Sequence, residues 1–262
     1  MISTKQQLYF DKWQLGKPNK TLETHSSFLY WCAQDNLAVV LKIYKSHSDE
    51  AAAANLLRHY DGCGAVKVLA HDEDACLLEQ VGNGRELVEF SRVGDDVKAA
   101  EILCQVIGKL HSAPAIDIGL RPVDEFVVDF EEYLARDFCV ERDLVERARR
   151  VYTDLSASQG NRLNLHGDLH HYNIMRAGDG GWVAIDPKGY WGEAEYELGA
   201  FLRNPLAGDF VGIDMGGRFD IIDAQLDYDM ERVKKWAFCQ AVLASVWADD
   251  DMVFARRMVG VF

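Results

Sequence analysis

The chain has 262 residues, which is enough for one large domain or two modest lobes, and hydrophobic residues make up 48% of it, so a sizeable core is available. The formal net charge of -14, from 42 acidic and 28 basic residues, argues against nucleic acid or an anionic membrane as the main partner; it is compatible with a cationic small molecule, although ordinary solubilising charge is the simpler explanation. No apolar run is long enough to span a bilayer, the N-terminus lacks a signal-peptide pattern, and the six cysteines form no CxxC pair, so we expect a cytoplasmic protein with reduced, mostly buried thiols.

The first eighty residues are expected to form mainly strands. The segments FLYWCAQ (28–34) and LAVVLKIY (37–44) are apolar and rich in β-branched and aromatic residues, and the turn pair Asp35-Asn36 separates them. This pattern predicts a hairpin. The other elements expected here are a helix over 48–60 and two strands within 65–81, on either side of a polar turn at 71–74.

The pattern becomes helical further along the chain. Apolar residues at helical spacing predict a helix within 95–114 that ends before Pro114, and a second long helix over roughly 126–158. The segments NIMRA, GDGG and WVAID predict a hairpin over 173–186. The tail from Met230 to Ala248 is expected to be a helix with apolar residues on one side.

These elements predict an α+β architecture with two lobes. Residues 1–81 would form a small β-rich N-lobe, residues 82–84 a hinge, and residues 85–262 a larger, mainly helical C-lobe. The two glycines of the hinge, Gly82 and Gly84, could be mistaken for part of a dinucleotide-binding fingerprint. No βαβ unit follows them, so hinge glycines are the better interpretation.

The segment NLHGDLHHYNIM (164–175) carries the densest polar chemistry in the chain. Asp168 and Asn173 have the D-x4-N spacing of a kinase-type catalytic loop, and Asp186 follows after a tight hairpin. Phosphoryl transfer needs one carboxylate to accept the proton of the attacking hydroxyl, and an amide oxygen and a second carboxylate to hold Mg²⁺. Asn173 and Asp186, at opposite ends of one hairpin, could face the same cation, while Asp168 would face the acceptor.

This segment has two other interpretations. His166, Asp168, His170 and His171 could bind zinc, but they lie on a loop and contain no H-x3-H helical pair. A capped polar turn could explain any one of these residues. It does not explain the regular spacing to Asp186.

The segment LHGDLHHYNI, followed by WVAIDPKGYWGEAEYELGAFLRNP, resembles the aminoglycoside and hydroxyurea phosphotransferase family, which includes the streptomycin 6-kinases. The similarity is strongest over residues 164–205 and extends more weakly over most of the chain. It implies a protein-kinase-like fold, Asp168 as the catalytic base, and Asn173 and Asp186 as Mg²⁺ ligands. Glu197 stands where the family usually has an aspartate that braces the catalytic loop; glutamate keeps the charge with a longer reach.

The resemblance also assigns the nucleotide site. Lys42 matches the strand lysine that contacts the α- and β-phosphates, rather than a solvent-facing strand lysine, and Glu50 is its expected ion-pair partner. No glycine-rich loop precedes the first strand; the segment LETHSSFLY occupies that place, with Ser27 as a candidate phosphate contact. The segment LLEQV resembles an adenine-binding hinge, in which the Glu79 carbonyl and the Val81 amide would pair with the base.

Several neighbouring residues are assigned less specific roles. Lys188 could approach a phosphate or the acceptor, or could be an ordinary surface lysine. Arg203 is expected to tie the loop to a helix through an internal ion pair. His166 is expected to be structural, and His170 and His171 are expected to be exposed.

The sequence thus predicts an ATP- and Mg²⁺-dependent kinase that phosphorylates a hydroxyl of a small molecule, with an aminoglycoside such as streptomycin as the leading acceptor. The alternatives are a sugar, an amino alcohol or hydroxyurea as acceptor, or a nucleotide-binding regulator without transfer activity. Six aspartates and a single basic residue, Arg218, lie between Asp209 and Asp229. This segment could bind a cationic acceptor, or could be a solvated face.

Overall fold

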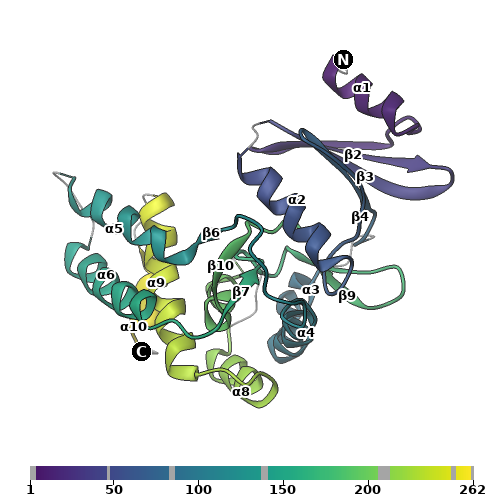
Figure 1. Ribbon diagram of the computed structural model, residues 1–262. Helices are drawn as coiled ribbons and strands as arrows, with labels where there is room; N and C mark the ends of the chain where they lie inside the picture. Colours follow the sequence, from purple (N-terminus) through teal and green to yellow (C-terminus); the bar gives the residue numbers. More distant parts are fainter. Residues whose placement is uncertain are drawn as a thin grey trace.

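The structure of the protein is a computed structural model that describes residues 4–45, 48–82, 86–136, 141–205, 213–248 and 252–260, apart from the side chains of residues 48–51, 253, 254 and 257. It has two lobes (Figure 1). The N-lobe, at the upper right, contains a five-stranded antiparallel sheet with the strand order β1-β2-β3-β5-β4. Its elements are α1 (Thr4–Lys12), β1 (Lys20–Glu23), β2 (Ser27–Gln34), β3 (Leu37–Tyr44), α2 (Ser48–Tyr60), β4 (Val68–Asp72) and β5 (Ala75–Glu79).

The hairpin of β2 and β3 confirms the sequence prediction. Its turn residues, Asp35 and Asn36, have φ angles of 45° and 71°, and both therefore lie in the left-handed region that a type I′ turn requires. β2 and β3 pair along their whole length, and this register places Lys42 opposite Leu29 on β2 and Cys76 on β5. The predicted helix α2 and the predicted strands β4 and β5 are present as well.

Helix α1 lies at the top of the N-lobe (Figure 1), and the sequence pattern does not predict it. Tyr9 and Phe10 are buried against the sheet. Lys12 forms an ion pair with Asp72 at the end of β4. The helix is therefore held by tertiary contacts with the sheet, which local sequence patterns do not reveal.

The C-lobe contains most of the helices, packed around the larger of the hydrophobic clusters. None of the helices in the described ranges combines the length and the apolar character that a membrane span needs. The elements of this lobe are α3 (Val88–Arg92), α4 (Asp96–Leu110), β6 (Arg121–Pro122), η1 (Val123–Phe126), α5 (Val127–Leu134), α6 (Arg142–Ala157), β7 (Arg162–Leu165), β8 (Ile174–Arg176), β9 (Trp182–Ala184), β10 (Tyr190–Glu193), η2 (Ala194–Leu198), α7 (Gly199–Leu202), α8 (Met215–Gln225), α9 (Met230–Ala248) and α10 (Val253–Val259).

The prediction of one long helix over 126–158 is wrong, because the chain forms two helices here, α5 and α6. Glu141, which precedes α6, has a left-handed φ of 52° that a continuous right-handed helix cannot contain. The guanidinium of Arg142 donates a hydrogen bond to the carbonyl of Leu134 at 3.0 Å, so a side chain from the start of α6 satisfies the last carbonyl of α5.

Helix α9 has the predicted bounds but not the predicted one-sided character. Its middle is buried all round, as the consecutive buried residues from Trp236 to Leu243 show. Helices α5, α6, α7 and α10 all pack against it. A helix that other helices surround is apolar on every face, so its sequence carries no single apolar stripe.

Two short sheets hold the loops that carry the candidate site. β7 pairs with β10, and β10 pairs with β6, while β8 and β9 form the predicted hairpin. Residues 166–173 therefore connect β7 to β8, and residues 185–189 connect β9 to β10. The hairpin lies below the N-lobe: the N–H of Gly82 donates to the carbonyl of Arg176 at 2.8 Å.

The thiols agree with the expectation of unpaired, mostly buried cysteines. Cys32, Cys76, Cys104 and Cys239 are buried and free, and Cys63 is free and exposed. Cys139 lies outside the described residues.

Candidate active site

His166 joins the two loops of the candidate site. Its side chain is fully buried. The Nδ1 atom accepts a hydrogen bond from the Asp168 N–H at 3.3 Å, so Nε2 is the atom that donates to the Ile185 carbonyl at 2.8 Å. The His166 carbonyl in turn accepts from the N–H groups of Lys188 and Gly189. His166 is therefore a structural residue, as expected, that fixes residues 166–168 against residues 185–189.

Gly167 must be a glycine for two reasons. Its φ of 80° lies in the left-handed region that favours glycine. A Cβ atom at this position would lie 2.4 Å from Cδ2 of Tyr190. The Tyr190 ring consequently packs directly on the backbone beside Asp168.

Glu197 braces the loop, and this confirms the role expected for it. Its two carboxylate oxygens accept hydrogen bonds from the N–H groups of His166 and Gly167, each at 2.8 Å. His111 lies 3.4 Å from the carboxylate, and its other ring nitrogen contacts the Tyr228 hydroxyl at 2.7 Å. Burial acts to raise the pKa of Glu197, but the hydrogen bonds and nearby histidines outweigh it and hold that pKa below its usual range.

Asp168 lies where the loop meets α7. Its Oδ1 atom is 3.3 Å from Nη2 of Arg203, and its Oδ2 atom is 3.7 Å from Nε2 of His170. Arg203, the residue that follows α7, thus forms the loop-to-helix ion pair that the sequence predicts. The amide nitrogen of Asn173 donates to the Asp168 carbonyl at 2.9 Å, so Asn173 stabilises the same loop.

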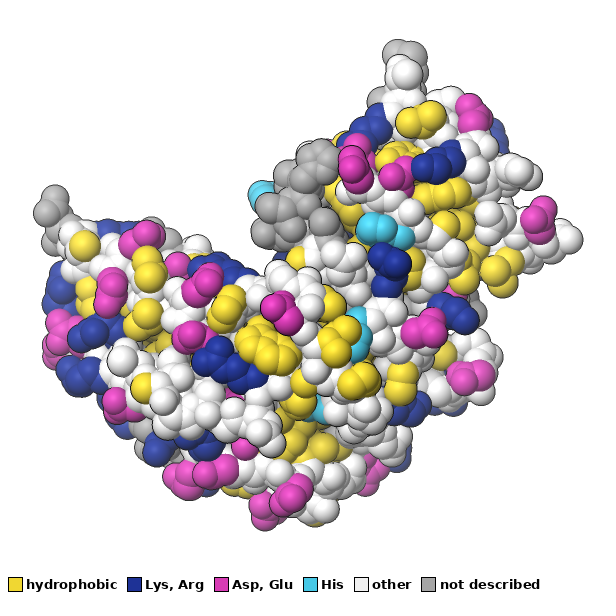
Figure 2. All heavy atoms as spheres, in the orientation of Figure 1, with side chains coloured by type: hydrophobic (Ala, Val, Ile, Leu, Met, Phe, Trp, Pro, Cys, Tyr) yellow, Lys and Arg dark blue, Asp and Glu magenta, His cyan; other side chains and the backbone are white. Residues whose placement is uncertain are grey.

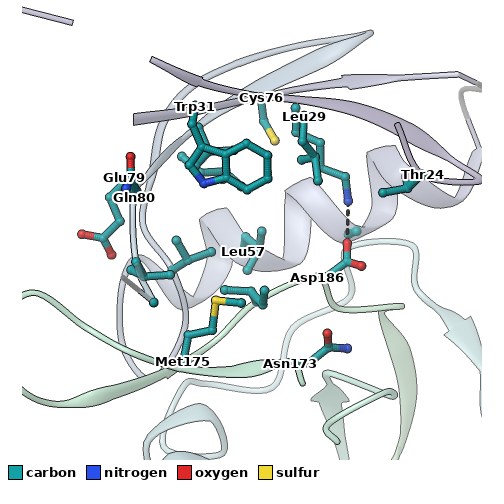
Figure 3. Close-up of a pocket in the computed structure, with 18 of the residues that line it drawn as sticks. Thr24, Leu29, Trp31, Leu57, Cys76, Glu79, Gln80, Asn173, Met175 and Asp186 are labelled. Carbon is teal, nitrogen blue, oxygen red and sulfur yellow. Dashed lines mark hydrogen bonds and ion pairs between the residues drawn. The ribbon is translucent and has the colours of Figure 1, made fainter. Parts of the chain in front are cut away.

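Lys42, Asn173 and Asp186 line the same cavity between the lobes. Figure 3 shows Asn173 and Asp186 on its floor. Nζ of Lys42 is 2.6 Å from Oδ1 of Asp186, an ion pair that joins β3 of the N-lobe to the loop after β9. The N–H of Ile185 donates to the Asn173 carbonyl at 2.9 Å, which sets Asn173 beside Asp186 at the base of the hairpin. The amide of Asn173 is directed towards Asp186 (Figure 3).

Asp186 combines an unusual backbone with a perturbed carboxylate. Its φ of 55° is left-handed, a conformation that is uncommon for a residue with a side chain and that recurs at functional sites. Burial acts to raise its pKa, but the charge and the hydrogen bond of Lys42 outweigh it and lower that pKa. Asp186 is therefore ionised at neutral pH and able to bind a cation.

A cavity of about 410 Å³ opens above these residues, between the two lobes (Figure 3). Apolar side chains from both lobes line it, including Leu29 and Val40 from the sheet and Met175 and Ile185 from the C-lobe. The predicted hinge residues Glu79 and Val81 lie on its wall. A slot of this shape, apolar at one end and charged at the other, suits a nucleotide.

Of two other residues predicted for the nucleotide site, Ser27 is placed differently and Glu50 is not tested. Ser27 is buried at the start of β2 with its N–H bonded to the Thr24 hydroxyl, and it does not line the cavity; Thr24 and Ser26 do. The expected ion pair of Lys42 with Glu50 stays a prediction, because the Glu50 side chain lies outside the described part of the chain.

A second cavity, of about 190 Å³, lies beside Asp168 in the C-lobe. Its walls come from the catalytic loop, from the segment 188–190, from η2, from the residue that follows α7, and from the C-terminal half of α9. The residues that line it are Gly167, Asp168, Lys188, Tyr190, Tyr196, Arg203, Gln240, Leu243 and Trp247. The catalytic loop thus separates two cavities, with Asn173 and Asp186 facing the first and Asp168 facing the second.

The expectation that His171 is exposed is wrong. Its ring is fully buried and stacks on Phe201, with 4.4 Å between the ring centroids. Arg218 lies 3.3 Å from its Nε2 atom, and Arg218 itself forms a buried ion pair with Asp96 at 2.6 Å. Burial and the nearby Arg218 charge lower the pKa of His171 well below its ordinary value. The adjacent His170 is partly buried against Asp168 and Tyr172.

The acidic segment does not line the site. Asp214 caps α8 by accepting a hydrogen bond from the Gly217 N–H, and Asp220 and Asp223 are exposed on that helix. Helix α8 lies at the lower end of the C-lobe, away from the N-lobe (Figure 1), and several acidic side chains are visible at that end of the surface (Figure 2). None of the described aspartates of this segment lines either cavity, and Asp209 lies outside the described residues.

The zinc interpretation finds no support. Within the part of the chain that the structure describes, no three histidine, cysteine or acidic side chains are placed to hold a metal ion together. Mg²⁺ needs fewer protein ligands, because phosphate oxygens and water complete its shell. The pair of Asn173 and Asp186 is compatible with that ion.

The fold and sequence comparisons agree. The chain shares its fold with aminoglycoside phosphotransferase APH(4)-Ia, solved in a ternary complex with ADP and hygromycin B, at a TM-score of 0.68, 13% identity, and coverage of 99% of this chain and 98% of that one. It is 30% identical over 246 residues to a streptomycin 3''-kinase of Klebsiella pneumoniae, covering 90% of each chain. It is 28% identical over 254 residues to a streptomycin 6-kinase of Streptomyces griseus, covering 92% of this chain and 81% of that one.

The family model described as aminoglycoside/hydroxyurea antibiotic resistance kinase matches residues 12–252, which include every element of the two-cavity site. The protein-kinase-like fold expected from the sequence is confirmed. The chain therefore belongs to the aminoglycoside/hydroxyurea antibiotic resistance kinase family, and it is a small-molecule kinase that uses ATP to phosphorylate a hydroxyl group.

Proposed function

We propose that this protein transfers the γ-phosphoryl group of MgATP to a hydroxyl of an aminoglycoside of the streptomycin type. The observation that carries the proposal is the division of the site by the catalytic loop: Asn173 and Asp186 face the interlobe cavity, and Asp168 faces the second cavity. Donor and acceptor would enter from different sides and meet at residues 166–173. This is the arrangement that in-line transfer between two bound molecules requires.

The residues present fit a Mg²⁺ ion at the inner end of the nucleotide cavity. Asp186 offers a carboxylate, and Asn173 offers an amide oxygen because its amide nitrogen is bonded to the loop. Oxygen donors of these types are the ligands that Mg²⁺ prefers. The bound ion would neutralise phosphate charge, and Lys42 would leave or share its contact with Asp186 to reach the α- and β-phosphates.

The base of the nucleotide would occupy the apolar end of the same cavity. Leu29 and Val40 would cover one face of the adenine and Met175 the other. The Glu79 carbonyl and the Val81 amide would pair with its edge. Thr24 and Ser26, together with the backbone of their turn, would contact the phosphates in place of Ser27, because they line the cavity and Ser27 does not.

Asp168 would act as the catalytic base. Its carboxylate faces the second cavity, and the Arg203 guanidinium fixes the orientation of one oxygen. A base held in this way can accept the proton of an acceptor hydroxyl without reorganising. Glu197 would act indirectly, because its carboxylate holds the backbone N–H groups of His166 and Gly167.

The choice of acceptor rests on the relatives, which are streptomycin kinases acting at two different positions. An assay of ATP consumption with streptomycin, other aminoglycosides, hydroxyurea, choline and simple sugars tests it. We expect turnover with streptomycin or a related aminoglycoside. Turnover with hydroxyurea alone, or with neutral sugars alone, would support the kinase assignment and contradict an aminoglycoside as the acceptor. Nucleotide binding without turnover on any acceptor would favour a regulator.

A further inference from the structure

The walls of the second cavity are aromatic and pre-positioned. Tyr190 packs edge-on against Phe126 with 4.9 Å between ring centroids, and Phe126 packs edge-on against Trp247 at 5.5 Å. All six tryptophans lie in the described ranges, and only Trp247 is exposed, at 52% of its surface. A large aromatic ring held in place but left in solvent, at the edge of a cavity beside the catalytic loop, is a candidate contact surface for a ligand.

The charges of this cavity are distributed unevenly. The inner end, next to the catalytic loop, holds Arg203, which is paired with Asp168, and Lys188 is a second cation on the cavity wall. Helix α9 runs along the wall, with Gln240 packed on Gly199 of α7. Trp247 lies seven residues further along α9, which is roughly 10 Å along the helix axis. An ammonium or guanidinium group would be repelled at the inner end and would find an aromatic face at the outer end.

A carboxylate supports that outer end. The indole Nε1–H of Trp247 donates to Oδ2 of Asp129 on α5 at 2.8 Å. This hydrogen bond fixes the plane of the ring, and the negative charge at its edge increases the electron density that the ring offers to a cation. Tryptophan is also the best of the aromatic side chains at binding a cation over its face.

We propose that Trp247 is a specificity-determining residue for the acceptor: its indole face receives a cationic group of the acceptor while the target hydroxyl lies at Asp168. Asp129 is a positioning residue that acts through the ring. This inference rests on the proposed function and deepens it. It assigns recognition of the positive charge to the end of α9 and to α5, in place of the acidic segment around α8. The acceptor class is a molecule that carries both a hydroxyl and an ammonium or guanidinium group.

Steady-state kinetics on four variants tests the assignment. Trp247→Leu removes the aromatic face and should raise the KM for streptomycin by about fivefold or more, with the KM for ATP unchanged. Trp247→Phe keeps an aromatic face, so its KM for streptomycin should lie between the values for the wild type and for Trp247→Leu. Asp129→Asn keeps an oxygen for the indole N–H but removes the charge, and should raise the streptomycin KM about twofold. The control, Asp220→Asn with Asp223→Asn, removes two charges from α8 and should change neither KM.

The kinetic results either support or overturn the role of Trp247. An unchanged streptomycin KM in Trp247→Leu, or an equal rise in the KM for ATP, overturns the inference. A rise in streptomycin KM in the α8 control alone returns recognition to the acidic segment. If the wild type phosphorylates no acceptor, the proposed function fails. Calorimetry then tests the role of Trp247 separately, by measuring the binding of streptomycin to the wild type and to Trp247→Leu. Weaker binding to Trp247→Leu than to wild type supports it, and equal binding or none overturns it.

Discussion

Asp186 illustrates how one residue serves both lobes. It lies in the loop after β9, it adopts a left-handed backbone, and it forms an ion pair with Lys42 on β3. The lysine keeps the carboxylate ionised, which is the state that binds a metal ion. The same contact holds the N-lobe sheet over the catalytic loop.

Replacing Asp186 with alanine should weaken binding of MgATP. Loss of even the outer partners of a metal ligand costs about tenfold or more in metal affinity, and loss of the ligand should cost at least as much. Calorimetry with ATP, with and without Mg²⁺, measures the effect, and the exposed Asp227→Ala serves as the control. Unchanged affinity and unchanged metal dependence would remove Asp186 from the metal site.

The contribution of Glu197 to stability should depend on pH. Because its pKa is lowered in the folded state, its contribution to stability is fully present above the ordinary glutamate pKa of about 4.3 and is lost as the pH falls through the lower, folded-state value. Glu197→Gln should reduce the free energy of unfolding by about 1–3 kcal/mol at neutral pH. The difference from wild type should shrink in acid. Urea unfolding at neutral pH and near pH 3 compares the two, and a difference that stays constant would contradict the assignment.

At the scale of elements, local signals predict those parts of the fold that local forces determine. The β2–β3 hairpin follows from Asp35-Asn36, and α4 follows from apolar spacing that stops before Pro114. Elements that depend on partners are different. The break between α5 and α6 depends on the conformation of Glu141 and on a hydrogen bond from Arg142, and α9 is buried on all sides by helices that come from elsewhere in the chain.

Helix α1 provides a direct test of tertiary stabilisation. Phe10 is buried against the sheet, whereas Leu8 on the same helix is 60% exposed. Phe10→Ala should reduce the free energy of unfolding by about 3–5 kcal/mol, while Leu8→Ala should change it by less than about 0.5 kcal/mol. Urea unfolding followed by fluorescence measures both. Similar small effects from the two variants would mean that α1 adds little to the N-lobe.

At the scale of the whole molecule, the sequence predicts the chemistry better than it predicts the recognition of the acceptor. Asp168, Asn173 and Asp186 are adjacent through one loop and one hairpin, so their spacing alone brings them to one place. The second cavity gathers Trp247, Tyr190 and Arg203 from segments that only the folded C-lobe brings together. The number of aspartates predicts a cation-binding segment around α8 instead. That number does not reveal which face of the lobe the aspartates occupy.

The variant Asp168→Asn tests whether the catalytic loop divides the site into a donor side and an acceptor side. With streptomycin, or the best acceptor found, as the substrate, turnover should fall on the order of 10²-fold or more, because a positioned base is lost. The affinity for MgATP, measured by calorimetry on the same protein, should stay near the wild-type value because Asp168 faces the second cavity. Near-normal turnover, or an equal loss of MgATP affinity and turnover, would contradict this division of the site.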